Sequence, residues 1–379
     1  MKNKKILFLV NNLSSFLSNR VDIALKLKKL GFDVHVAYGE KGNFNNNILK
    51  KKNIISHFCK FDRSSINPFK EVMHIIKIYN LLKHIRPNLV HLVTIKPYLY
   101  GSISARLLGI HSVVCAVAGL GTLFISEKIF YRFIRVLLYP IFFLAFNHKN
   151  QKVIFQNKHD KLKLISWGVI RGKKTVLIKG SGVNLKKFNN FKEAKGLPII
   201  CFASRLLKDK GILEFIEAIK LLKLSKVNFK AYIAGDFDKG NPTSLTHEEL
   251  NKYLKNTPIV FKGHIKNIAK LYSKSHIICL PSYREGFPKS LIEAAASGRP
   301  VVTTNVPGCR DAIIPNKSGY LVPAKNVEKL SKSLKKLILN PALRIKMGKE
   351  NRKYAKKEFN INTVIEKHIK IYKSLLINI

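Results

Sequence analysis

The sequence predicts an α/β protein of two domains, and three observations support this. Short, continuous apolar runs alternate with longer amphipathic stretches, which is the pattern of parallel strands that helices cover on both faces. The alternation begins anew after a Lys- and Asn-rich segment near the middle of the chain, NLKKFNNFKEAKGLP. At 379 residues, the chain is also longer than one hydrophobic core usually supports. We therefore expect one parallel sheet in residues 1–190 and a second in residues 191–359.

The apolar runs of the first half predict strands, and an amphipathic stretch that ends at Gly31 predicts a helix between the first two. We interpret the segment that follows the first strand, NNLSSFLSNR, as a loop. The expected elements are strands at Ile6–Val10, Val34–Ala37, Leu89–Val93 and Ser112–Ala116 and a helix at Ser18–Leu30.

One segment of the first half is far more apolar than its neighbours. Ile129–Phe146 carries only two charges, Arg132 and Arg135. Its uncharged part, Val136–Phe146, is shorter than the roughly 20 residues that a transmembrane helix needs. Two interpretations stay open: a core helix of the first domain, or an interfacial segment whose arginines meet lipid phosphates.

The series of strands continues after the Lys- and Asn-rich segment, which we interpret as the linker between the domains. An amphipathic stretch at Asn360–Leu376 follows a long helical region. The expected strands of the second half are Ile199–Ala203, Lys230–Ala234, Ile259–Lys262, Ile277–Leu280 and Val301–Thr304.

The charge of the chain predicts anionic partners. The sequence holds 69 Lys and Arg against 22 Asp and Glu, a formal net charge of +47, which creates a positive field over much of the surface. The lysines are scattered, without the aromatic interleaving or finger spacing of nucleic-acid modules. We therefore favour an anionic membrane surface and a phosphate-bearing ligand over nucleic acid.

The cysteines and the first residues indicate a cytoplasmic protein. Five cysteines at wide spacing include no C-x-x-C pair, so we expect buried thiols in a reducing compartment. The basic start is followed by an apolar run that Asn11 and Asn12 end early, which is unlike a signal peptide.

Two cations follow the first strand of the second half. Arg205 and Lys210 stand where that strand ends, and open α/β sheets bind ligands at the carboxyl ends of their strands. A guanidinium can bridge two phosphate oxygens while an ammonium supplies a point charge. The pair therefore suits a diphosphate. The alternative is that Arg205 and Lys210 are two solvated cations, which would show the same sequence pattern.

A second stretch, REGFPKSLIEAAASG, predicts a loop and a helix over Ser290–Ser297 with Pro288 near its first position. The loop Glu285-Gly286-Phe287-Pro288 then offers backbone N–H groups to an anion at the helix start. Glu285 and Glu293 are acceptors for sugar and ribose hydroxyls. The alternative for Glu293 is an ordinary exposed residue.

These stretches resemble the family 4 glycosyltransferases of the GT-B fold. The resemblance rests on REGFPKSLIEAAASGRPVV, with its E-x7-E spacing, on ASRLLKDKG, and on KGSGVN, YIAGD and FKGHI. It implies two facing Rossmann-like domains with parallel sheets and an interdomain cleft, the first domain binding the acceptor and the second the nucleotide sugar. It also implies that residues 360–379 pack back on the first domain.

The resemblance assigns roles to residues of the second domain. Arg205, Lys210 and Glu285 form the catalytic set: the cations hold the donor diphosphate, and Glu285 holds the transferred sugar. The remaining donor-binding residues are the amides of Gly286, Phe287 and Pro288 for the sugar, Glu293 for the ribose, and Gly235 and Ile265 for the base.

The phrases TTNVPGCRD and AVAGLGTLF resemble a bacterial branch that builds capsule, O-antigen and N-glycan precursors. This branch implies a retaining hexosyltransferase on the inner face of the cell membrane. Its donor is expected to be UDP-linked, with an N-acetylhexosamine favoured, and its acceptor a polyprenyl diphosphate-linked glycan. No metal or other cofactor is expected, and Asp236-x-Asp238 is interpreted as a chance D-x-D.

The acceptor half departs from the family in two places. NNLSSFLSNR has no glycine, and CAVAGLGTLF offers Gly119 and Gly121 where many members carry a histidine. We identify no catalytic histidine, and take His91 and Lys96 as further acceptor-side candidates, with Lys96 facing lipid phosphates. The alternatives are a GT-B sugar-nucleotide epimerase and a basic membrane- or nucleic-acid-binding protein.

Overall fold

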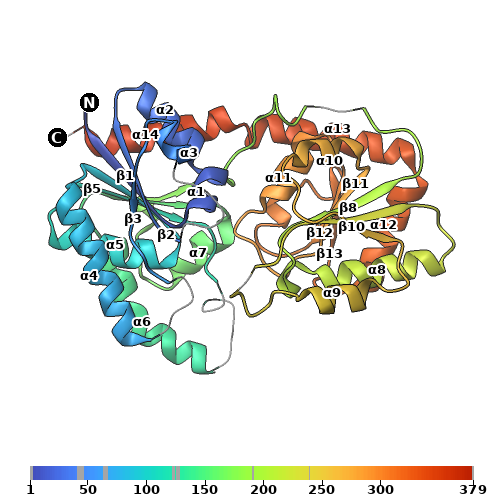
Figure 1. Ribbon diagram of the computed structural model, residues 1–379, viewed down its shortest axis with the longest axis horizontal. Coiled ribbons are helices and arrows are strands. Elements are labelled where there is room, and N and C mark those ends of the chain that lie inside the picture. The colour runs from blue at the N-terminus through green and yellow to red at the C-terminus, as the bar shows by residue number, and fades with distance from the viewer. Residues whose placement is uncertain are drawn as a thin grey trace. The chain divides into compact units, whose positions relative to one another are not determined.

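The computed structural model describes residues 3–40, 47–62, 67–121, 124, 129–189, 192–238 and 240–377. The chain divides into two compact units. The first comprises Met1–Ser181 together with Asn362–Ile379, and the second comprises Gly182–Ile361. Each unit has its own parallel sheet and helices (Figure 1).

The first unit contains a seven-stranded parallel sheet in the order β3-β2-β1-β4-β5-β6-β7. Its strands are β1 (Lys5–Asn12), β2 (Asp33–Glu40), β3 (Ile55–Phe58), β4 (Leu89–Val93), β5 (Ser112–Val117), β6 (Gln151–Phe155) and β7 (Thr175–Leu177). Its helices are α1 (Leu13–Asn19), α2 (Val21–Lys29), α3 (Asn47–Lys50), α4 (Pro68–Ile85), α5 (Ile95–Leu107), α6 (Ile129–Phe146), α7 (Lys158–Ser166), the short η2 (Gly172–Lys174) and α14 (Ile361–Leu376).

The second unit contains a six-stranded parallel sheet in the order β10-β9-β8-β11-β12-β13. Its strands are β8 (Ile199–Ala203), β9 (Lys230–Ala234), β10 (Ile259–Phe261), β11 (Ile277–Leu280), β12 (Val301–Thr304) and β13 (Gly319–Val322). Its helices are η3 (Lys208–Lys210), α8 (Ile212–Leu224), α9 (His247–Leu254), α10 (Ile268–Lys274), α11 (Lys289–Ala296), η4 (Arg310–Ala312), α12 (Val327–Leu339) and α13 (Pro341–Glu358).

The predicted α/β class is confirmed in both units. Strands β4, β5 and β11 are buried along their whole length, because helices cover both faces of a parallel sheet. Side chains from strand and helix then fill the space between the layers. Phe202 of β8, for example, packs against Phe215 of α8 with ring centroids 5.5 Å apart.

The segment interpreted as a loop after the first strand is helical. Strand β1 continues to Asn12, whose side chain accepts a hydrogen bond from Ser15 N at 2.8 Å and so caps α1. The chain breaks at Arg20, with φ −132°, and α2 begins at Val21. The expected helix at Ser18–Leu30 was therefore wrong at its start, because the side-chain cap begins an extra helix before it.

Four strands were missed: β3, β6, β7 and β13. Strands β3 and β7 are short, lie at the two edges of the first sheet and are partly exposed, so their residues include polar side chains. Continuous apolar runs identify only strands that are covered on both faces. The signal missed three of the four edge strands, β3, β7 and β13, but it found the edge strand β10 and missed the inner strand β6.

Helix α14 belongs to the first unit, although α12 and α13 before it belong to the second. Figure 1 shows it in red beside the blue N-terminal elements. The hydroxyl of Tyr372 lies 2.5 Å from His91 Nδ1 on β4. Ser112 Oγ donates to Leu375 O at 2.9 Å, and Lys4 Nζ donates to Leu376 O at 3.0 Å. These bonds fix α14 against the first sheet.

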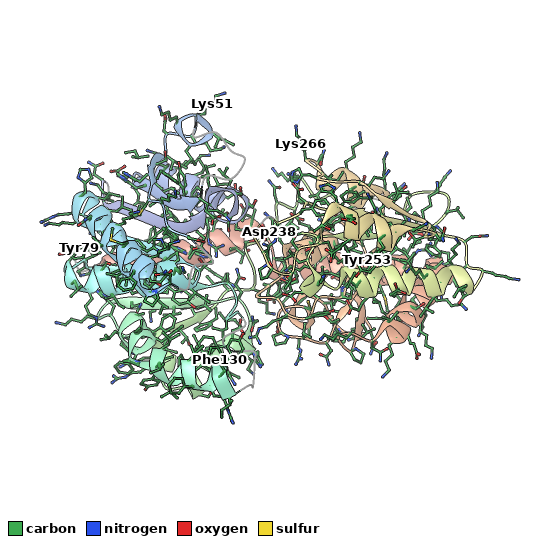
Figure 2. The ribbon with its side chains drawn as sticks, turned by 60° about the horizontal axis from the view of Figure 1, so that its bottom comes forward. Lys51, Tyr79, Phe130, Asp238, Tyr253 and Lys266 are labelled. Carbon is green, nitrogen blue, oxygen red and sulfur yellow. The ribbon has the colours of Figure 1, made fainter. Side chains whose placement is uncertain are left out.

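Helix α6 is the apolar segment Ile129–Phe146, and it packs beside α5. Only Phe142, Ala145 and Phe146 are buried, whereas Phe130, labelled in Figure 2, is 63% exposed. In the described part of the chain, α6 is the one helix with the length and apolar composition of a membrane span. The core-helix interpretation therefore holds only for its C-terminal end.

Candidate active site

The expected donor residues lie where the sheet of the second unit changes its direction of winding. In the order β9-β8-β11-β12, the chain leaves β8 toward one edge and β11 toward the other. The loops after such strands diverge and leave a crevice at their carboxyl ends. Arg205 and Lys210 follow β8, and Glu285 follows β11, so all three lie at this switch point.

Two glycines allow the loops of this site to pack directly against neighbouring backbone. A Cβ on Gly211 would lie 2.1 Å from Pro281 O, and one on Gly235 would lie 1.7 Å from Ser204 O. Both glycines have positive φ, 74° and 154°, which disfavours any other residue. The loops after β8, β9 and β11 are thereby held close together.

Lys210 and Glu285 form an ion pair across the switch point. Lys210 Nζ lies 2.5 Å from Glu285 Oε1, and the two side chains are only 16% and 11% exposed. Glu285 is fixed further by its own backbone N–H, which donates to Pro307 O at 3.3 Å. Two of the three expected catalytic residues are therefore in contact, although they come from different loops.

Arg205 makes a different pair. Its Nη1 contacts Oδ2 of Asp238, which lies on the loop after β9 and is labelled in Figure 2. The side chain of Arg205 is 49% exposed and that of Asp238 is 17% exposed. Asp238 was missed as a site residue because the D-x-D spacing was interpreted as a chance occurrence. The nearby run of cations was the signal for an acidic partner.

Helix α11 begins at Lys289, and Pro288 occupies its N-cap position. Pro288 was therefore misplaced as a first helical residue. It also lacks an N–H, so of the three expected amides only those of Gly286 and Phe287 can donate. Pro288 instead supplies its carbonyl, which accepts from the N–H of Leu291 at 3.2 Å.

Glu293 lies within α11 and is mostly buried, so its interpretation as an ordinary exposed residue was wrong. Burial raises the pKa of its carboxyl to about 7, while nearby Lys289 and Lys187 act in the opposite direction. Within the described residues, no side chain or backbone N–H hydrogen-bonds this carboxyl. Such a group is suited to a ligand that brings hydroxyl donors.

The two residues expected to flank a base come from neighbouring strand ends. Gly235 directly follows β9, and its N–H donates to Gly263 O, 2.9 Å away in the loop after β10. Ile265 lies two residues further along that loop and packs partly buried against the core of the second unit. Gly235 and Ile265 therefore both lie at the carboxyl ends of strands of the same sheet.

A cavity of about 250 Å³ lies at the corresponding switch point of the first unit. It is lined by Asn11, Thr94, Ile95, Lys96, Ala118, Gly119 and Gly121. Three acceptor-side candidates, Lys96, Gly119 and Gly121, are thus brought together. Lys96 Nζ donates to Glu71 Oε1 and to Asp62 O, each at 2.7 Å. Asn11 was missed, and its buried Oδ1 has no hydrogen-bond partner among the described residues.

His91 does not line this cavity. It is fully buried, it bonds to Tyr372 of α14, and its ring stacks on Phe8 with centroids 5.1 Å apart. Burial, and then the charge of Arg20, hold its pKa well below the usual range. The surroundings of His91 are those of a core residue that secures α14, and nothing in them brings it to an acceptor.

Two parallel α/β sheets, with a Lys–Glu pair at the switch point of the second, agree with the GT-B fold that the sequence predicted. Two family descriptions match the chain: Glycosyl transferase 4-like over residues 5–157 and Glycosyl transferases group 1 over residues 184–354. The chain therefore belongs to the glycosyltransferases that combine these two domains. The epimerase and nucleic-acid alternatives find no support in these matches.

Characterised relatives resemble the chain over most of its length. N,N'-diacetylbacillosaminyl-diphospho-undecaprenol alpha-1,3-N-acetylgalactosaminyltransferase of Campylobacter jejuni is 28% identical over 333 residues, 84% of this chain and 86% of the relative. The capsular polysaccharide biosynthesis glycosyltransferase CapM of Staphylococcus aureus is 27% identical over 388 residues, 99% of this chain and 98% of the relative.

Solved structures confirm the fold. A glycosyltransferase from Rickettsia africae superposes with a TM-score of 0.76 at 23% identity, covering 99% of both chains. Anabaena HepE in complex with UDP superposes with a TM-score of 0.76 at 17% identity, covering 98% of this chain and 100% of that one. At these identities the likeness concerns the fold alone.

Proposed function

We propose that the chain transfers a sugar from a UDP-linked donor to a polyprenyl diphosphate-linked glycan, with retention at the anomeric carbon. The observation that carries this proposal is the largely buried Lys210–Glu285 pair at the switch point of the group 1 domain. Two relatives whose names specify diphospho-undecaprenol acceptors support the choice of acceptor class, and their named N-acetylgalactosaminyl and galactosyl transfers support a hexose or N-acetylhexosamine.

The donor diphosphate is assigned to the cations of the second unit. Lys210 and Arg205 would neutralise the charge that grows on the departing phosphate. When a phosphate oxygen binds Lys210, it competes with Glu285, whose two carboxylate oxygens then accept hydroxyls of the sugar. The N–H groups of Gly286 and Phe287 face the same ligand in this scheme. Glu293, whose carboxyl no protein group in the described residues hydrogen-bonds, would receive the ribose hydroxyls.

Retention follows if the acceptor hydroxyl enters on the face from which the nucleotide leaves. The departing phosphate can then take the hydroxyl's proton, so the scheme requires no strong general base. Positioning and fixed positive charge supply the catalysis. The scheme also calls for no metal or other cofactor, because Lys210 and Arg205 balance the diphosphate charge.

The acceptor is assigned to the cavity of the first unit. The unpartnered Oδ1 of Asn11 offers an acceptor for a sugar hydroxyl, and the N-terminus of α5 adds N–H donors and a favourable dipole for oxygen anions. Lys96 brings a cation to the same cavity, and Gly119 and Gly121 leave room for a ligand to approach the backbone. This combination suits a phosphorylated glycan.

A lipid-linked acceptor requires contact with a bilayer, and α6 is suited to it. Its exposed apolar side chains include Phe130, Phe133, Val136 and Leu137, and Arg132 is exposed among them. An apolar helix face that carries arginines binds the headgroup region of anionic membranes. The net charge of +47 adds long-range attraction. We assign the protein to the inner face of the cell membrane on this basis.

The test is a transfer assay with a panel of UDP- and GDP-sugars and a polyprenyl diphosphate-linked glycan in detergent. A product heavier by one sugar, formed with a UDP-sugar and with the α configuration retained, supports the proposal. Conversion of the sugar nucleotide without acceptor, or transfer from GDP-sugars alone, contradicts it. The first step is thermal stabilisation by UDP against GDP, since a ligand that binds the native state raises its stability.

A further inference from the structure

The acidic partner of Arg205 has no task in the transfer described so far. We propose that Asp238 is a positioning residue, which holds the guanidinium of Arg205 in the orientation that receives the donor diphosphate. The inference rests on the proposed function, because it takes Arg205 as a diphosphate ligand. It adds a residue on the loop after β9 to the machinery of the donor site.

The carboxylate of Asp238 is itself held in place by its loop. Its backbone N–H donates to Ser244 Oγ at 3.0 Å, and Asn241 Nδ2 donates to its Oδ2 at 3.2 Å. The N–H of Asn241 also donates to Asp238 O at 2.9 Å. Because these bonds fix both backbone and side chain, the acceptor oxygen that faces Arg205 has a defined position.

The loop of Asp238 is also fastened to the segment that carries Arg205. Leu206 N donates to Asp236 O at 3.0 Å, and Lys208 N donates to Thr243 O at 2.8 Å. On the loop of Asp238 these bonds lie on either side of the ion pair, and on the other segment both bonded residues follow Arg205. The backbones of the two segments are therefore joined next to the ion pair.

Arg205 retains the capacity to bind a second anion. In the described part of the chain, Nη1 is the only one of its nitrogens that makes a hydrogen bond, and half of the side chain is exposed. A guanidinium has five N–H donors in a fixed planar arrangement. The donors that do not face Asp238 can therefore bind a phosphate while Nη1 stays bonded to Asp238. An arginine fixed in this way loses less rotamer freedom when the ligand binds.

The test is calorimetric titration of UDP into the full-length protein and its variants. Asp238→Ala is expected to weaken UDP binding by about tenfold, since the arginine must then be ordered by the ligand. Asp238→Asn keeps an acceptor oxygen for Nη1 and is expected to stay within about threefold of the unchanged protein. Binding of uridine, which has no phosphate, should not change.

The matched control is Glu217→Ala, which removes a carboxylate from the exposed Glu217–Lys220 pair on α8. It should leave UDP affinity unchanged. Thermal unfolding of each variant checks that the fold is kept. If Asp238→Ala does not fold, Asp238→Asn is used for the test. Near-normal UDP affinity of Asp238→Asn then supports the proposal, and UDP binding that is several-fold tighter contradicts it.

A double-mutant cycle with Arg205→Ala separates the two proposals. If Asp238 acts through Arg205, Asp238→Ala causes no further loss in the Arg205→Ala background. Additive losses would overturn the positioning role, and so would tighter UDP binding by Asp238→Ala, which would mark Asp238 as a competitor of the phosphate. If Arg205→Ala alone leaves UDP affinity unchanged, the donor site itself has been wrongly assigned.

Discussion

Lys210 and Glu285 are separated by 75 residues in the sequence, yet Lys210 Nζ lies 2.5 Å from Glu285 Oε1. The pair joins the loop after β8 to the loop after β11, and both side chains are largely buried. In the proposed reaction, the binding of a donor phosphate to Lys210 therefore also prepares the site for the donor sugar. A phosphate that takes over Lys210 leaves the Glu285 carboxylate available for the sugar.

Removing either member of this pair should stop transfer in distinguishable ways. Lys210→Ala is expected to lower both UDP affinity and kcat, the latter by about 100-fold or more, because a fixed charge at the leaving group is lost. Glu285→Gln should lower kcat strongly but leave UDP affinity within a few fold, since Glu285 is assigned to the sugar. Steady-state kinetics and UDP titration check both, and a Glu285→Gln variant with normal kcat would contradict the assignment.

The raised pKa of Glu293 predicts a pH-dependent stability. Its folded pKa of about 7 lies above the unfolded value of 4.5, so ionisation opposes folding and stability is lost as pH rises between these values. Glu293→Gln mimics the protonated form. It should raise the free energy of unfolding at pH 8, by about 3 kcal/mol at most, and change it little at pH 4.

Denaturant unfolding at the two pH values measures this difference. Glu328→Gln on α12 is a suitable control, because it removes a carboxyl from another helix of the same unit. An equal effect of Glu293→Gln at both pH values would show that burial does not oppose ionisation of this carboxyl.

The exposed face of α6 predicts membrane binding. Replacing Phe130 and Phe133 together by Asp should weaken binding to vesicles with anionic lipids by at least tenfold, because burial of one such side chain contributes about 1.5–3 kcal/mol. Raised salt should weaken the binding further by screening the basic surface. Vesicle sedimentation measures both. The control is Leu224→Asp on α8, an equally apolar residue that is 78% exposed; loss of binding there too would remove the special role of α6.

The contact between Tyr372 and His91 predicts a contribution to stability. Tyr372→Phe keeps the ring but leaves His91 Nδ1 buried without its partner. The expected loss is about 1–3 kcal/mol in the free energy of unfolding, the cost of an unsatisfied buried polar group. Thermal and denaturant unfolding measure it, while UDP affinity should stay unchanged in the folded protein. Weaker UDP binding would place this contact in the machinery of the donor site.

The fold was predictable to the extent that strands are buried on both faces. β8, β9, β11 and β12 have the bounds that their apolar runs predicted. The edge strand β3 was missed because it contains polar residues and so lacks a continuous apolar run. The helix α1 was missed because the side-chain cap of Asn12, rather than an apolar pattern, marks its start. Pro288 shows a similar limit, since proline is favoured at the first helical position but lies here at the N-cap, where its side chain caps nothing.

Taken alone, the amino-acid sequence determined the α/β class, the two domains and the residues of the donor motifs, because periodicity and turn chemistry act over a few neighbours. Only the tertiary structure decided which charges meet: Lys210 with Glu285, Arg205 with Asp238. It also decided that His91 lies under α14. Such pairings depend on loops that are far apart in the sequence. The order of the strands and the packing of glycines against neighbouring backbone bring these loops together, and no local sequence pattern specifies this.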